Sequence, residues 1–323
     1  MKAFSPSRGF GIYVAVAFLA GCVGGSQLGA NQIQPNAPQT RANLALVDRG
    51  AGAHAARGRS WMASNVTKKD LLYVSNFYAS DTLVFTYPSG KLAGTLNGVG
   101  TVACASASTG DWWTAGNDEM LEYAHGGKSP IKTLSGASGS CAVDSKSGDL
   151  AVLNIGGDDI IIYPGGSGLG TPNCVGIGSA YFDGYDDRGD LFIDGVTQGD
   201  AYGLVELRKG GSTCENITLS QSLEFPGGIQ WYDNYLAVGD QEAGAIYHFA
   251  IHGTNAKEIG TTELGGSSDV AAFYIQKPYV AGADAGNEDV ELWKYPAGGP
   301  IFKTLQGNFD LPIGLIVSVG KRR

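Results

Sequence analysis

The chain has 323 residues, 50 of them glycine, and only 16% of its residues are charged. Glycine is roughly twice as frequent as in average globular proteins, and charged residues fall well short of the usual quarter or so. This composition is typical of many short strands joined by tight turns. The formal net charge is −9, and residues 70–323 alone carry −16. Such a domain repels phosphate, so the composition argues against nucleic-acid binding.

The N-terminus predicts an exported protein. Two basic residues frame the start of the chain, and an apolar run over residues 10–19 follows them. The run is too short to span a bilayer, and it fits the apolar core of a signal peptide. It ends in Leu19-Ala20-Gly21-Cys22, which resembles the lipobox of bacterial lipoproteins. The resemblance implies a signal peptide over residues 1–21 and a lipidated N-terminal Cys22, anchored in the bacterial cell envelope. The alternative is an ordinary signal peptide with a cysteine at the cleavage site.

Residues 22–69 have no periodic apolar pattern and are rich in Gly, Ala, Asn, Gln and Arg. We interpret them as a flexible tether between the lipidated cysteine and a folded domain over residues 70–323. The net charge of residues 23–69 is +5, the opposite sign to that of the domain. The tether either lies against anionic lipid headgroups or acts as a soluble spacer.

The domain repeats one pattern six times. An apolar or aromatic residue opens the second strand of each unit, and these residues follow one another at intervals of 38 to 45 residues: Leu72, Trp112, Leu150, Leu191, Leu236 and Tyr279. A period near 40, built of short strands and glycine turns, predicts an all-β fold, a six-bladed β-propeller.

The two ends of the repeat predict how the ring closes. The first unit lacks an innermost strand, because only polar residues precede Asp70. The last unit is followed by a spare apolar strand over residues 313–319. We expect this strand to lie beside residues 71–76 and to complete the first blade, which leaves no open sheet edge where the chain begins and ends.

The third unit carries a family resemblance. Cys141-Ala142-Val143-Asp144, followed by Gly148-Asp149-Leu150-Ala151-Val152, resembles the NHL-type repeat, and Leu72-Tyr73-Val74-Ser75-Asn76 matches its second strand. The resemblance covers residues 70–319 and implies an NHL-type or gluconolactonase-like propeller. Such propellers include protein-binding and RNA-binding modules, lactonases and lyases, so the resemblance specifies a fold and no single chemistry.

Four cysteines remain beyond Cys22, which permits two disulfides in an exported chain. Cys104 and Cys141 fall in the innermost strands of neighbouring units, so we favour this pair; Cys174 with Cys214 is the second candidate, and free buried thiols are the alternative. Histidine is scarce. His248 and His252 are interpreted as surface turn residues with no shared site.

The patterned chemical feature is acidic. Every connection between second and third strands carries a carboxylate, and these connections emerge on one face of a propeller: Asp81, Asp118, Glu119, Asp158, Asp159, Asp200, Glu242, Glu288 and Asp289. We call these residues the acidic rim. Hard cations such as Ca²⁺ favour such oxygen donors, although Asp is also common in turns for conformational reasons. Four further residues end second strands and are candidates for the channel mouth: Asn76, Asn154, Asp240 and Asp284.

The sequence favours a non-catalytic module that binds an envelope protein or a glycan, because no catalytic constellation is recognisable. No cofactor is required for this function, and Ca²⁺ is the candidate cation. The alternative is a metal-dependent hydrolase or lyase of the gluconolactonase-like class, which needs several polar side chains to converge at the channel mouth.

Overall fold

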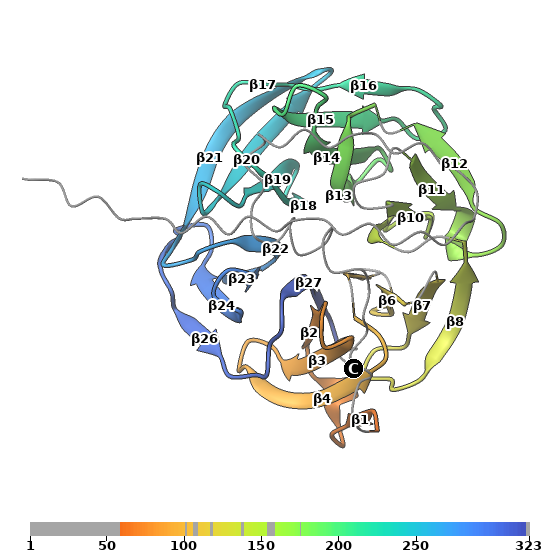
Figure 1. Ribbon diagram of the computed structural model, residues 1–323, viewed down its shortest axis with the longest axis vertical. Coiled ribbons are helices and arrows are strands. Elements are labelled where there is room, and N and C mark those ends of the chain that lie inside the picture. The colour runs from red at the N-terminus through yellow and green to blue at the C-terminus, as the bar shows by residue number, and fades with distance from the viewer. Residues whose placement is uncertain are drawn as a thin grey trace, which may run out of the picture. The chain divides into compact units, whose positions relative to one another are not determined.

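The computed structural model describes residues 59–100, 102–105, 109–116, 119–136, 139–153, 159–174 and 176–320. Its strands form six sheets around a common centre (Figure 1), antiparallel except where β17 (Thr218–Leu219) and β25 (Gly299–Pro300) pair in parallel with β21 (Asn255–Gly265). The prediction of an all-β, six-bladed propeller is confirmed. None of the described helices is long and apolar enough to cross a membrane. Cys22 lies outside the described residues.

Blades 1 to 3 are built from the N-terminal half of the domain, and blade 1 also takes in the C-terminal strand. Blade 1 consists of β1 (Trp61–Met62), β2 (Leu71–Asn76), β3 (Asp81–Thr86), β4 (Lys91–Asn97) and the C-terminal β27 (Pro312–Ser318). Blade 2 consists of β5 (Ala103–Ala105), β6 (Trp112–Ala115), β7 (Glu119–Tyr123) and β8 (Pro130–Ser135). Blade 3 consists of β9 (Ser140–Val143), β10 (Leu150–Leu153), β11 (Asp159–Tyr163) and β12 (Thr171–Cys174).

Blades 4 to 6 complete the ring. Blade 4 consists of β13 (Ser179–Tyr185), β14 (Leu191–Val196), β15 (Tyr202–Leu207) and β16 (Cys214–Asn216). Blade 5 consists of β17 (Thr218–Leu219), β18 (Pro226–Tyr232), β19 (Tyr235–Asp240), β20 (Ala245–His252) and β21 (Asn255–Gly265), with β25 (Gly299–Pro300) paired to β21. Blade 6 consists of β22 (Val270–Gln276), β23 (Tyr279–Asp284), β24 (Asp289–Lys294) and β26 (Lys303–Leu305). The described ranges also hold two single-turn 3₁₀ helices, η1 (Val66–Lys68) and η2 (Pro164–Gly166).

The ring closes as the sequence predicted. Strand β27 pairs antiparallel with β2 over its whole length, from Leu71 opposite Ser318 to Asn76 opposite Pro312. It therefore occupies the innermost position of blade 1, beside the channel (Figure 1). All seven of its residues are buried. The first and last segments of the propeller thus share one sheet, so unfolding either end exposes the other.

The folded part of blade 1 begins earlier in the chain than the domain boundary that the sequence predicted. Strand β1 pairs with the outer edge of β4, with Met62 opposite Gly94. A Cβ atom on Gly94 would lie 2.5 Å from the Met62 Sδ and 2.8 Å from the Trp61 carbonyl oxygen, so glycine permits this close approach. The folded sheet therefore begins ahead of residue 70, where the sequence had placed the end of the tether. A two-residue strand has no period that a sequence pattern could reveal.

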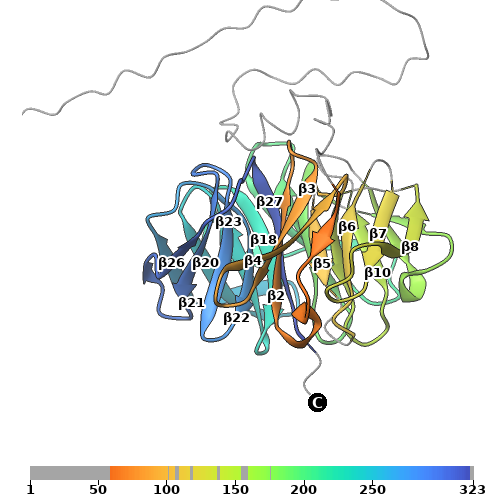
Figure 2. The ribbon, with the colours of Figure 1, turned by 90° about the horizontal axis from the view of Figure 1, so that it is seen from below.

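The core lies between neighbouring blades. In one cluster the Tyr73 ring of blade 1 stacks on Trp112 of blade 2 at a centroid distance of 4.2 Å, and Trp112 stacks on Tyr123 at 5.1 Å. Burying such large aromatic surfaces contributes roughly 1.5–3 kcal/mol for each apolar side chain. Figure 2 shows the blades from the side, with their strands running between two opposite faces of the ring. One face carries the turns from first to second strands, and the other carries the connections from second to third strands.

Candidate functional site

A cavity of about 290 Å³ lies at the centre of the ring. Its wall is formed by the innermost strands β5, β9, β13, β18, β22 and β27, so every blade contributes to it. Ser145, Asp186 and Asp187 extend the wall to the turns that follow two innermost strands. Since strand direction alternates, these turns lie on the face opposite to the connections that carry the acidic rim. The cavity therefore reaches the face opposite to the one on which the sequence placed the acidic rim.

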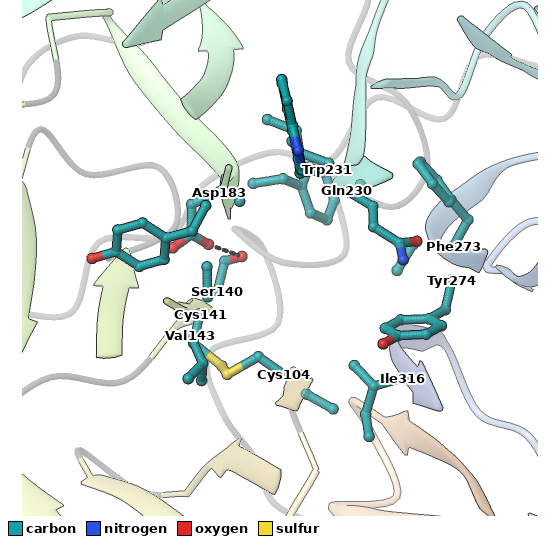
Figure 3. Close-up of a pocket in the computed structure, with 18 of the residues that line it drawn as sticks. Cys104, Ser140, Cys141, Val143, Asp183, Gln230, Trp231, Phe273, Tyr274 and Ile316 are labelled. Atoms are coloured by element: carbon teal, nitrogen blue, oxygen red, sulfur yellow. Dashed lines mark hydrogen bonds between the residues drawn. A yellow bond between two sulfur atoms is a disulfide. The ribbon is translucent and has the colours of Figure 1, made fainter. Parts of the chain in front are cut away.

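Asp183 is the most unusual group in this cavity. It lies in β13, is 6% exposed, and its Oδ1 accepts a hydrogen bond of 2.7 Å from the Ser140 hydroxyl (Figure 3). Its Oδ2 is buried and has no hydrogen-bond partner among the described residues. Burial raises the pKa of Asp183 to about 7, and the hydrogen bond from Ser140 only partly opposes this effect. Asp183 therefore offers a desolvated acceptor that a ligand could satisfy.

Aromatic and amide side chains form the wall across from Asp183. Figure 3 shows Trp231, Phe273 and Tyr274 around the same space, on strands from blades 5 and 6. Gln230 links these blades, because its amide nitrogen donates to the Ile275 carbonyl at 3.2 Å while the Ile275 amide donates to its carbonyl oxygen at 2.7 Å. This pair of bonds fixes the wall at the point where two separate sheets meet.

A disulfide joins blades 2 and 3 on the cavity wall. Cys104 in β5 and Cys141 in β9 are bonded, with their Cα atoms 5.6 Å apart (Figure 3). This is the pair that the sequence favoured. Cys214 is also disulfide-bonded. Together with Gln230, the Cys104–Cys141 bond makes the channel a preorganised cavity, which reduces the entropy lost when a ligand binds.

The described members of the acidic rim do not form one cluster. Asp118 and Asp158 lie outside the described residues. Asp200, Glu242 and Glu288 are exposed in their connections, whereas Asp81, Glu119, Asp159 and Asp289 are partly buried at the first residue of a third strand. The described rim carboxylates are spread over the six blades, with Glu288 and Asp289 adjacent in blade 6, and none of them lines the central cavity.

Two of the predicted channel-mouth residues, Asp240 and Asn76, serve the connections between blades. Asp240 is 2% exposed, and its carboxylate accepts hydrogen bonds from the Glu224, Phe225 and Ala243 amides at 2.7, 3.1 and 3.2 Å. Asn76 donates to Asp81 Oδ1 at 2.8 Å and to the Asn308 carbonyl. Asn154 lies outside the described residues. The Asp240 and Asn76 side chains are bonded in the connections and do not line the channel, because second strands lie one position away from the axis.

One acidic cluster does form among the described residues, in blade 6. Asp284, Asp289 and Glu291 each offer an oxygen, and these oxygens lie within 4.8 Å of one another. Burial, followed by the charges of Asp289 and Asp284, raises the pKa of Glu291 to about 8. Sequence reasoning missed Glu291, because it lies inside a third strand and not in a connection. The alternation Asp289-Val290-Glu291-Leu292 was the available signal, since it places two acids on one face of a strand.

The sequence suggested that His248 is a surface turn residue, but the structure places it in the core. It lies inside β20, is 7% exposed, and its Nε2 is 3.2 Å from the Thr262 hydroxyl and 3.1 Å from the Tyr295 hydroxyl. Burial lowers the pKa of His248, which favours the neutral ring. The strand is longer than the sequence pattern indicated, so a residue assigned to a strand end became part of the core between blades 5 and 6.

Comparisons with known proteins support the fold alone. No protein-family model matches the chain, and no curated protein matches its sequence. A chain from the crystal structure of a nidogen/laminin complex superposes with a TM-score of 0.64 at 10% identity, covering 78% of this chain and 100% of that one. A protein of unknown function from Bacteroides caccae superposes with a TM-score of 0.58 at 12% identity, covering 77% of this chain and 99% of that one. The NHL-type resemblance stays a prediction.

Proposed function

We propose that this protein is an exported, lipid-anchored propeller of the bacterial cell envelope that binds a partner protein through its central channel. The observation that carries the proposal is Asp183, a buried carboxyl with an unpartnered oxygen on the wall of the cavity. An unpartnered buried acceptor is costly, and a ligand that donates a hydrogen bond to it recovers that cost. Residues 1–22 support the location by their resemblance to a lipoprotein leader.

The charge of the cavity favours a cationic group. Its described lining contains three carboxyl groups, from Asp183, Asp186 and Asp187, and no Lys, Arg or His side chain. Trp231 and Tyr274 add aromatic rings, whose faces attract cations. A volume of about 290 Å³ admits a single side chain or a small head group. A lysine side chain on an envelope protein has the positive charge and hydrogen-bond donors that complement these carboxyl groups, and it is long enough to reach into the cavity.

The likeness to a chain from a nidogen/laminin complex is consistent with a propeller that acts as a binding module. The metal-dependent hydrolase or lyase has less support, because it needs several ligand groups that converge on the axis. In the part of the chain that the structure describes, the acidic cluster belongs to β23 and β24, and none of its three members lines the channel.

Isothermal titration at pH 8 with three small probes tests the proposal: capped lysine, capped glutamate and N-acetylglucosamine. We expect capped lysine to bind, and Asp183→Asn to weaken it at least tenfold, which is about 1.4 kcal/mol. Glu242→Gln, an exposed rim variant, is the matched control and should leave binding unchanged. Binding of the sugar without capped lysine, or equal binding by wild type and Asp183→Asn, would contradict a cationic ligand in the channel.

A further inference from the structure

The sheet register of blade 6 gathers three carboxyl groups on one side. Asp284 ends β23 opposite Asp289 at the start of β24, and Gly282 lies opposite Glu291. Directly opposed residues project from the same face of a sheet, so all three acids share a face. Val280 and Trp293, the next opposed pair on the same face, pack against the core of blade 5. The acids are accordingly on the face that meets blade 5, near the connections between second and third strands.

Two oxygens in this cluster are buried without a partner. Glu291 is 2% exposed, and its Oε2 has no hydrogen-bond donor among the residues that the structure describes. The Asp289 Oδ1 is in the same state. The oxygens that Asp284, Asp289 and Glu291 offer lie within 4.8 Å of one another, so the unpartnered side chain of Glu291 is directed into the cluster. Burying a carboxyl group under these conditions is costly unless something neutralises it.

Asp284 itself is held firmly. Its two oxygens accept hydrogen bonds from the amides of Ser268, Asp269, Gly286 and Asn287, at 2.6, 3.0, 3.0 and 2.9 Å, and from the Asn287 side chain at 3.1 Å. These donors stabilise its negative charge. Asp284 can therefore act as a fixed anionic wall while Asp289 and Glu291 supply oxygens that are free to coordinate.

Blade 5 shows that the turn does not need the two extra acids. Asp240 takes the place of Asp284 there and accepts similar backbone hydrogen bonds. The positions that correspond to Asp289 and Glu291 hold Ala245 and Tyr247, by the same register of opposed pairs. The structural role of the strand-end aspartate is thus complete without them. Gly282, opposite Glu291, lets Val270 and Trp293 pack closely beside it, since a Cβ atom there would lie 2.8 Å from Val270 and 2.9 Å from Trp293.

We propose that Asp284, Asp289 and Glu291 form a Ca²⁺ site between blades 5 and 6, separate from the channel. Carboxylate oxygens are the ligands that hard divalent cations prefer, and no nitrogen or sulfur ligand belongs to the cluster. Ca²⁺ tolerates irregular geometry and a mixture of carboxylate and water ligands, whereas Mg²⁺ demands a near-ideal octahedron. A bound cation neutralises charges that otherwise repel one another on the face of blade 6 that meets blade 5.

Thermal unfolding and isothermal titration of the chelator-treated, purified protein test the site, with CaCl₂ and MgCl₂ as probes. We expect Ca²⁺ to raise the Tm by roughly 5–10 °C at a hundredfold excess over its Kd. Glu291→Gln keeps the shape of the side chain but removes the charge, so it should bind Ca²⁺ at least tenfold more weakly and lose the Tm rise. Asp289→Asn is a second variant that should behave in the same way.

Glu288→Gln is the matched control, because Glu288 adjoins Asp289 but is exposed and outside the cluster. This variant should keep the full response to Ca²⁺. The proposal is overturned if millimolar Ca²⁺ neither binds nor changes the Tm of the wild type. It is equally overturned if Glu291→Gln and Asp289→Asn respond as the wild type does, or if Mg²⁺ binds as tightly as Ca²⁺. These measurements do not involve the channel, so a negative result for Ca²⁺ does not affect the test with capped lysine.

Discussion

The substitution Asp183→Asn should make the stability of the propeller less dependent on pH. Burial holds the pKa of Asp183 at about 7, whereas the ordinary value is 3.8. Between these values the folded protein retains a proton that the unfolded chain has already lost. The free energy of unfolding of the wild type therefore falls as the pH rises from about 4 to about 7, and this contribution is constant below and above that window.

The size of the effect follows from the two pKa values. A difference near three pH units, at about 1.4 kcal/mol per unit, corresponds to about 4 kcal/mol of stability lost by the wild type at pH 8. Asparagine is neutral at every pH and keeps a carbonyl oxygen that can accept the hydrogen bond from Ser140. The variant should hence match the wild type near pH 4 and exceed its stability by up to about 4 kcal/mol at pH 8.

Urea unfolding of the ligand-free protein at pH 4, 5.5, 7 and 8.5 measures this difference, because all other titrating groups are shared by the two proteins. Asp187→Asn is the control, since Asp187 lines the same cavity but is exposed. It should change the free energy of unfolding by no more than about 0.5 kcal/mol at any pH. A difference between Asp183→Asn and wild type that stays constant over this range would refute the reasoning, because Asp183 would then be solvated.

Two further predictions concern the ends of the chain. Truncation after Leu311 removes β27, exposes the edge of β2 and opens the channel, so we expect the cooperative thermal transition to be lost. Removal of residues 321–323 alone is the control and should leave the Tm unchanged. An unaltered thermal transition after the longer truncation would contradict closure by the C-terminal strand. Cys22→Ser should convert a membrane-associated protein into a soluble exported one. Mass spectrometry of the native N-terminal peptide should find acyl chains on Cys22. If the variant stays in the membrane fraction and the native peptide carries no acyl mass, the lipobox interpretation is wrong.

The ring and its closure could be predicted because their signals are local. Glycine turns recur near a period of 40 residues, and the spare apolar strand at the C-terminus matches a missing strand at the N-terminus. The Cys104–Cys141 pair was also within reach, because neighbouring repeats place both residues in innermost strands. Strand β1 was not, since two residues carry no period. The acidic connections were recognisable as a pattern, but the pattern gave no measure of which carboxylates are exposed.

The sequence by itself thus determined the number of blades, the repeating order of the strands within a blade and the way the ring closes, because these depend on repetition along the chain. Only the tertiary structure decided which acids matter chemically. Asp183 is unusual because it is buried in the wall of a cavity that six strands from different blades enclose, and Glu291 because blade 5 covers the face on which it lies. Desolvation and the loss of hydrogen-bond partners arise from contacts between distant segments, and residue type and spacing carry no information about them.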